Sequence, residues 1–174
     1  MTGSPPRVRP SWDETWLAQA RAIGARSLCS RAQVGAVIVS SDNSRTWVGY
    51  NGVPAGFEHN DRPCVEWCPR AQKFRRFSPS YDDCYTVHAE VNALLKMDRE
   101  LGRGGTLYTT GDVCFACAKV VANSGLATVV VLSDGLAAHR KPDDTYRFLE
   151  RCGLSVIVHT GNLSGSGPVV TYNA

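Results

Sequence analysis

Long hydrophobic runs are missing from this sequence of 174 residues. No stretch approaches the roughly 20 apolar residues that a membrane-spanning helix requires. The first ten residues, Met1–Pro10, hold prolines and arginines but lack the apolar core of a secretory signal. We therefore expect a cytoplasmic protein that does not associate with membranes.

A strong net charge is also missing, since 19 Lys and Arg residues against 16 Asp and Glu residues leave a net charge of +3. So small a positive charge is compatible with a phosphorylated small molecule as ligand, and it does not argue for nucleic acid binding. The densest basic stretch is Lys73–Phe77, where phenylalanines interleave with basic residues as in a platform for single-stranded nucleic acid. A solvated loop is the simpler interpretation, and we do not expect nucleic acid to be a partner.

Cysteine, by contrast, is abundant, with seven residues in the chain. Because no export signal is recognisable, metal ligation is a better interpretation of these thiols than disulfide bonding. The number is odd, so at least one thiol lies outside any paired or metal-bound set. The seven are Cys29, Cys64, Cys68, Cys84, Cys114, Cys117 and Cys152.

Residues 11–160 are expected to form one domain, between a disordered N-terminal arm at 1–10 and a Gly/Ser-rich C-terminal tail at 161–174. Ser11 and Glu14 form a capping box ahead of a helical apolar pattern. Hydrophobic periodicity predicts helices at 12–27, 88–99, 114–123 and 142–151, and strands at 34–40, 46–50, 106–109, 127–132 and 154–159. A leading hairpin followed by βα repeats predicts an α/β fold with three α/β/α layers, in which helices cover both faces of a mixed five-stranded sheet. The long irregular segment 51–84 is expected to be functional or held by another group.

Two short motifs 26 residues apart indicate a metal centre: His88-Ala89-Glu90 and Cys114-Phe115-Ala116-Cys117. Two cysteines at i and i+3 share one face of a helix, so both sulfurs can reach one ion. One imidazole and two thiolates leave the fourth position of a tetrahedral Zn²⁺ open for water, as in catalytic zinc sites. The helix N-terminus predicted at Cys114 favours the thiolate form.

Glu90 is the predicted catalytic residue, because a carboxylate beside the open position can move protons between water and substrate. Zinc deaminases combine the same ligand types with a glutamate that acts as proton shuttle and not as ligand. A purely structural zinc or a redox-active Cys-x-x-Cys is the alternative interpretation, but the two motifs together favour a catalytic zinc.

These motifs belong to a longer pattern that resembles the cytidine deaminase superfamily and, within it, the deoxycytidylate (dCMP) deaminase branch. The resemblance covers about residues 12–157. Its most specific pieces are Gly49–Gly56, His88–Ala93 and Cys117–Lys119. The other matching pieces are Ser27–Arg31, Gln33–Val39 and Thr106–Thr110.

The resemblance implies a cytidine deaminase-like fold and a zinc-dependent deaminase domain over residues 11–160. It implies hydrolysis of dCMP to dUMP and ammonia, which supplies dUMP for thymidylate synthesis. It also implies a homo-oligomer, often a hexamer, that dCTP activates and dTTP inhibits, with Mg²⁺ bound to these effectors. By position, Asn51 would contact the deoxyribose, and the backbone of Ala89 would face the pyrimidine. Asn51 could instead be a turn residue ahead of glycine.

The chain departs from this pattern at Val113, where the family normally has proline directly before the first zinc cysteine. Valine can adopt similar backbone angles, so zinc binding should survive the change. The altered loop leaves open a 5-substituted dCMP or another modified or antibiotic cytosine compound as substrate. It is also the only support for an inactive, zinc-stapled binding protein. The sequence does not identify which of the many Arg and Lys residues binds the phosphate.

Four cysteines outside the two motifs form a full tetrahedral donor set: Cys29, Cys64, Cys68 and Cys84. Some members of the family hold a second, structural zinc near the long loop. A zinc ion here would explain how a proline-rich loop stays ordered, and we predict such a site. The alternative is that these thiols are small buried apolar groups and loop residues.

Overall fold

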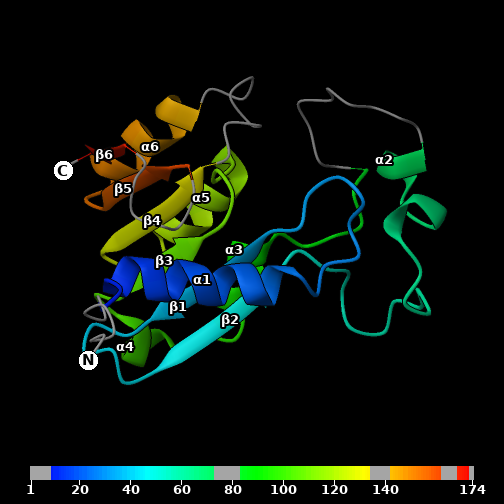
Figure 1. Cartoon of the computed structure of the whole chain (residues 1–174), viewed down its shortest axis with the longest axis horizontal. Coiled ribbons are helices and arrows are strands. Elements are labelled where there is room, and N and C mark those ends of the chain that lie inside the picture. Colours follow the sequence, from blue (N-terminus) through cyan, green and yellow to red (C-terminus); the bar gives the residue numbers. More distant parts are fainter. Residues whose placement is uncertain (1–8, 73–82, 134–141, 162–167, 173–174) are drawn as a thin grey trace, which may run out of the picture.

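The computed structural model describes residues 9–72, 83–133, 142–161 and 168–172. Its strands form one sheet in the order β2-β1-β3-β4-β5-β6 (Figure 1). The central strands β3, β4 and β5 are parallel, whereas β1 is antiparallel to β2 and β3, and β6 is antiparallel to β5. The strands are β1 (Gly35–Val39), β2 (Thr46–Tyr50), β3 (Thr106–Thr109), β4 (Thr128–Ser133), β5 (Ser155–Thr160) and β6 (Val169–Tyr172).

The first helix starts where the sequence predicts. The backbone N–H of Ser11 donates to Glu14 at 2.7 Å, and the N–H of Glu14 donates to the Ser11 hydroxyl at 3.2 Å, which completes the capping box. No helix in the described part of the chain has the length and apolar character needed to cross a membrane. The helices are α1 (Trp12–Gly24), η1 (Cys64–Glu66), α2 (Pro69–Gln72), α3 (Ala89–Leu94), α4 (Arg99–Gly102), α5 (Phe115–Ala122) and α6 (Pro142–Arg151).

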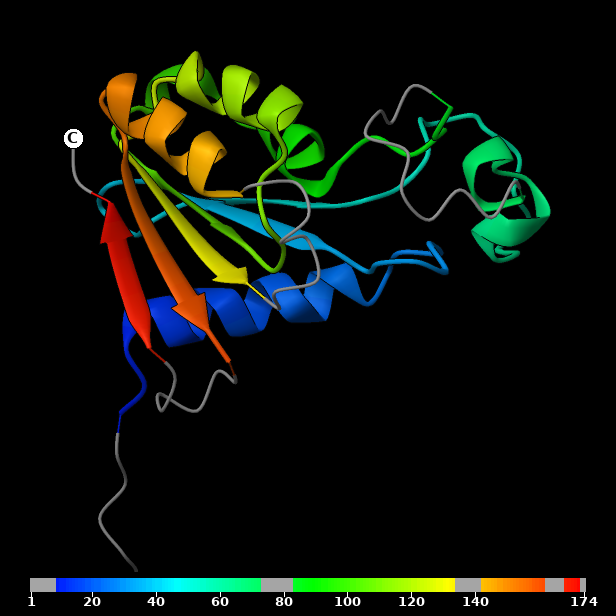
Figure 2. The same ribbon diagram turned by 90° about the horizontal axis from the view of Figure 1, so that it is seen from above.

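Helices cover both faces of the sheet, which confirms the predicted three layers. Figure 2 shows α1 on one face and α3, α5 and α6 on the other. The alternation of side chains along β1 explains the two layers, since Val37 and Val39 pack under α1 while Ala36 and Ile38 face the other helices. A strand that helices cover on both faces is buried, and all five residues of β1 are buried.

The sheet has six strands, so the predicted number of five is wrong. The sixth strand, Val169–Tyr172, comes from the segment 161–174 that was expected to be a loose tail. Its residues pair with Val156–His159 at the open edge of β5, where unsatisfied backbone groups favour a further strand. The boundary predicted at residue 160 therefore excludes a strand of the sheet.

The predicted helix at 88–99 is too long. Helix α3 ends at Leu94, and a separate helix, α4, begins at Arg99 with Asp98 as its N-cap. The Asp98 carboxylate accepts hydrogen bonds from the N–H groups of Glu100 and Leu101, each at 3.0 Å, and so caps α4. Between β2 and α3, the described residues that include η1 and α2 extend away from the sheet in both views (Figures 1 and 2). A backbone bridge between Gly52 and Val87 joins the two ends of this extension.

Candidate metal centre and active site

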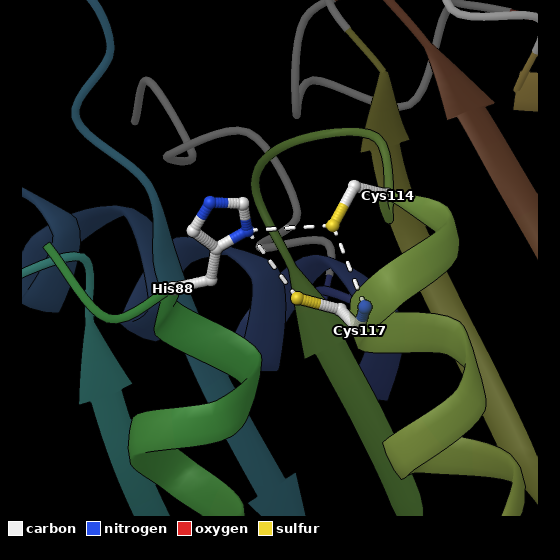
Figure 3. A group of neighbouring side chains, drawn as sticks. All are labelled: His88, Cys114 and Cys117. Carbon is white, nitrogen blue, oxygen red and sulfur yellow. Dashed lines mark hydrogen bonds between the residues drawn. The ribbon is translucent and has the colours of Figure 1, made fainter. Parts of the chain in front are cut away.

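Three predicted ligands meet between the starts of two helices. His88 is the N-cap of α3, Cys114 is the N-cap of α5, and Cys117 lies in the first turn of α5. Figure 3 shows the imidazole and both sulfurs pointing toward one another. The Nδ1 atom of His88 lies 3.5 Å from the Cys114 sulfur and 3.3 Å from the Cys117 sulfur.

This donor set fits zinc in chemistry and in spacing. All three ligand atoms lie within 4.8 Å of one another. A tetrahedral Zn²⁺ at about 2.0–2.1 Å from nitrogen and about 2.3 Å from sulfur holds these two atoms about 3.5 Å apart. The observed separations of 3.5 and 3.3 Å agree with that value. His88 would therefore bind the metal through Nδ1.

The Cys114 thiol is poised to bind a cation. Hydrogen bonding from Cys117 lowers the pKa of the Cys114 thiol to about 4, and the neighbouring His88 adds to this effect against the opposing influence of burial. The backbone N–H of Cys117 also points at the Cys114 sulfur, at 3.4 Å. The start of a helix thus favours the thiolate, which is the form that binds zinc.

Glu90 lies beside these ligands in the first turn of α3, with only 3% of its surface exposed. Burial raises the pKa of its carboxyl, while the charge of His88 and a hydrogen bond with Cys117 act in the opposite direction. A buried carboxyl with a raised pKa can both accept and return a proton near neutral pH. This placement suits the proton-shuttle role predicted from the sequence.

The start of α3 is fixed by its close approach to β2. A side-chain carbon at Gly49 would overlap the backbone of Ala89 and Ala93, so only glycine lets the helix lie this close. Asn92 adds hydrogen bonds from its amide to the carbonyl oxygens of Tyr50, at 2.8 Å, and Val87, at 3.3 Å. These contacts hold the residues on both sides of His88.

The two predicted substrate contacts lie near this site, and their roles stay predictions. Ala89 is fully buried at the first position of α3. The Asn51 side chain accepts a hydrogen bond from the Val34 N–H at 2.8 Å and donates one to the Ala32 carbonyl at 2.9 Å. Asn51 therefore has a structural role beside β1, and its amide keeps further donor and acceptor capacity for a ligand.

The loop before Cys114 holds a contact that the sequence did not reveal. The Tyr146 hydroxyl on α6 donates a 2.6 Å hydrogen bond to Asp112. Val113, the position that departs from the family pattern, is 2% exposed and packs in the main core. A hydrogen bond between residues 34 positions apart leaves no local pattern in a sequence.

The other four cysteines also gather. Cys64 and Cys68 are buried, and Cys29 and Cys84 pack against them. Hydrogen-bonding contacts link Cys29 with Cys64 and Cys68 with Cys84, so the thiols form two pairs. Within the described ranges, the tight group of three donors detected is the one at His88, and the four thiols are more loosely spaced. The basic stretch Lys73–Phe77 lies outside the described residues.

A His-Cys-Cys donor set with a buried glutamate, at the edge of a three-layer α/β/α sheet, defines a zinc-dependent deaminase of the cytidine deaminase-like fold. The model of the cytidine and deoxycytidylate deaminase zinc-binding region matches residues 10–133. The chain therefore belongs to this family, which contains the dCMP deaminases.

Relatives of known sequence agree with this assignment. The deoxycytidylate deaminase of Mycobacterium phage D29 is 42% identical over 127 residues, which cover 70% of this chain and 94% of the phage protein. The deoxycytidylate deaminase of Homo sapiens is 32% identical over 123 residues, which cover 71% of this chain and 65% of the human protein. The chain thus matches nearly all of the phage relative and a smaller share of the human one.

Solved structures show the same fold. The dCMP deaminase of cyanophage S-TIM5 in apo form is 26% identical and superposes with a TM-score of 0.63, covering 86% of this chain and 98% of that one. The same enzyme in complex with dCMP and dUMP is 25% identical and has a TM-score of 0.61, covering 87% of this chain and 99% of that one.

Proposed function

We propose that this protein is a zinc-dependent deaminase that hydrolyses dCMP to dUMP and ammonia, and so supplies dUMP for thymidylate synthesis. The convergence of His88, Cys114 and Cys117 beside the buried Glu90 carries the proposal. The similar phage enzymes are deoxycytidylate deaminases, and one of them was solved with dCMP and dUMP. The partner of the present protein is accordingly a small pyrimidine nucleotide. Its deaminase domain spans residues 11–160 with β6 added.

The residues divide the chemistry between binding and proton transfer. His88, Cys114 and Cys117 would hold the zinc ion, which when bound supplies Lewis-acid activation of water. Glu90 takes a proton from the attacking water and delivers it to the ring nitrogen N3. It then moves the proton of the hydroxyl added at C4 to the amine, which leaves as ammonia while the C4 carbonyl forms. Its burial keeps the carboxyl away from bulk water during these transfers. The backbone of Ala89 faces the pyrimidine, and Asn51 contacts the deoxyribose.

Ammonia release by the purified protein tests this function. The panel is dCMP, 5-methyl-dCMP, 5-hydroxymethyl-dCMP, CMP, dCTP and deoxycytidine, each with and without dCTP as effector. Turnover confined to dCMP would support the proposal. Preference for a 5-substituted or unphosphorylated compound would favour the second candidate, in which the Val113 loop has changed the accepted base. Bound zinc without any turnover would instead indicate an inactive, zinc-stapled binding protein.

We also propose a second, structural zinc held by Cys29, Cys64, Cys68 and Cys84. The half-buried Cys29 and Cys84 pack against the buried Cys64 and Cys68, and the Ser30 N–H already donates to the Cys64 sulfur at 3.2 Å. Such N–H groups accompany metal-bound sulfur in the outer shell of many sites. Replacement of Cys68 with Ser should lower the zinc content from two ions per chain to one. An unchanged zinc content would contradict the proposed second site.

We further propose that the chain assembles as a homo-oligomer such as a hexamer, with dCTP and dTTP as effectors bound with Mg²⁺. Support for this comes from the resemblance to dCMP deaminases. Sedimentation with and without each nucleotide tests the assembly, and ammonia release in their presence tests the regulation. The cytoplasmic location stays a prediction.

A further inference from the structure

The loop Gly111–Val113 between β3 and α5 presents the first zinc cysteine, and both core packing and hydrogen bonds determine its position. The side chain of Val113 is buried in the core. One carboxylate oxygen of Asp112, Oδ1, accepts the 2.6 Å hydrogen bond from Tyr146. The other, Oδ2, is buried and has no hydrogen-bond partner among the described residues. Within the part of the chain that the structure describes, the Tyr146 hydroxyl is therefore the polar group that keeps this carboxylate in place.

Tyr146 is itself held by its own helix, α6, and by β6. It lies on α6 with 2% of its surface exposed, and its ring packs 5.6 Å from the ring of Tyr172 on β6. The Tyr172 hydroxyl donates to Asp143 in the first turn of α6 at 2.7 Å. Burial, together with the nearby Asp112, raises the pKa of the Tyr146 phenol, so that it remains a donor. The donor that holds Asp112 thus has a fixed position.

We propose that Tyr146 is a positioning residue for the metal centre, whose hydroxyl fixes the Cys114 sulfur through Asp112. Only Val113 separates Asp112 from Cys114 in the chain. Without the hydroxyl, both oxygens of this half-buried carboxylate would lack partners among the described residues, and such a group moves toward water rather than stay unpaired. That movement would carry the loop and displace the cysteine. This inference rests on the zinc centre of the proposed function.

Zinc affinity, measured by competition with a chromophoric chelator, tests the role of the hydroxyl without any substrate. Tyr146→Phe keeps the ring and removes only the hydroxyl, and should weaken zinc binding about tenfold, the lower end of the effect of removing a supporting hydrogen bond around a metal. Tyr172→Phe is the matched control, because it keeps the ring that packs against Tyr146 and removes only a hydroxyl that bonds Asp143 and not the loop. It should leave the affinity within about twofold of the wild type.

A double-mutant cycle separates positioning from general packing. Asp112→Ala should weaken zinc binding about as much as Tyr146→Phe, and the double variant should be no weaker than either single one. Additive losses, an unchanged affinity in a folded Tyr146→Phe, or an equal loss in Tyr172→Phe would each overturn the proposal. If Tyr146→Phe does not fold, the zinc affinity of Asp112→Ala tests the proposal, and an unchanged affinity would overturn it.

The proposed function and this inference fail separately. A wild-type protein that binds zinc but releases no ammonia from dCMP would overturn the function and leave the affinity measurements valid. A protein that deaminates dCMP, and whose Tyr146→Phe variant binds zinc as tightly as the wild type, would overturn only the positioning role.

Discussion

At the scale of the residue, replacing Glu90 tests the proposed proton transfer separately from metal binding. Glu90→Gln keeps the size of the side chain but removes the exchangeable carboxyl. Zinc content should stay at the wild-type value, because the proposed ligands are His88, Cys114 and Cys117. Ammonia release from dCMP should fall at least about a hundredfold, as expected when a general acid–base group is lost. Substantial residual turnover at full zinc occupancy would exclude Glu90 as the proton shuttle.

The assignment of Cys117 as a ligand can be tested against another cysteine of the same chain. Cys117→Ala should lose the catalytic ion, because two donors remain where three are needed. Cys152 is exposed and lies away from both cysteine groups, so Cys152→Ala should keep the wild-type zinc content and activity. Metal analysis of the two purified variants gives the comparison. Retained stoichiometry in Cys117→Ala would show that another group completes the site.

Residues with local patterns were predictable, and residues joined across the fold were not. His88, Cys114 and Cys117 stand in short motifs at helix starts, so spacing alone predicted that they would meet. The bond between Asp112 and Tyr146 depends on how α6 lies against the loop before α5, and no spacing rule gives that arrangement. The same holds for His159, which had no partner in the sequence and lies 3.3 Å from an Asp13 oxygen in the structure.

At the scale of the element, the start of α3 depends on Gly49. Gly49→Ala would place a carbon against the backbone of Ala89 and Ala93, so the helix must move away from β2. We expect a loss of about 1–3 kcal/mol in the free energy of unfolding, as for other overpacked sites. Activity should fall with it, because the helix carries His88 and Glu90. Urea unfolding and ammonia release measure the two effects, and an unchanged stability would show that the two elements can separate freely.

The errors in the predicted elements have local physical causes. The run Val169–Tyr172 has the β-branched and aromatic composition of a strand, but it follows a Gly/Ser-rich stretch that suggested a tail. Only the open edge of β5 shows that it has a place to pair. The helix at 88–99 was extended through Asp98, although aspartate favours N-caps over helix interiors. Periodicity therefore identified the main layers, while capping at Asp98 determined where α4 begins and edge pairing determined the sixth strand.

At the scale of the whole molecule, the two proposed metal sites connect parts of the chain that are far apart in sequence. The catalytic site joins the starts of α3 and α5, and the proposed structural site joins the segment after α1 with the extension between β2 and α3. Zinc bound only to the folded state stabilises it by about 2.7 kcal/mol when free zinc is about a hundred times its dissociation constant. Removal of the metal should therefore lower the melting temperature.

The contribution of each site can be separated by comparing variants with and without a chelator. In His88→Ala the catalytic ion is lost, so any remaining decrease in melting temperature on chelation belongs to the four cysteines. In Cys68→Ser the remaining decrease belongs to the catalytic centre. If both sites are real, each variant should retain part of the wild-type response, and the double variant should have none. If His88→Ala melts at the same temperature with and without chelator, the four cysteines hold no zinc that stabilises the fold. The catalytic zinc would then be the only stabilising metal.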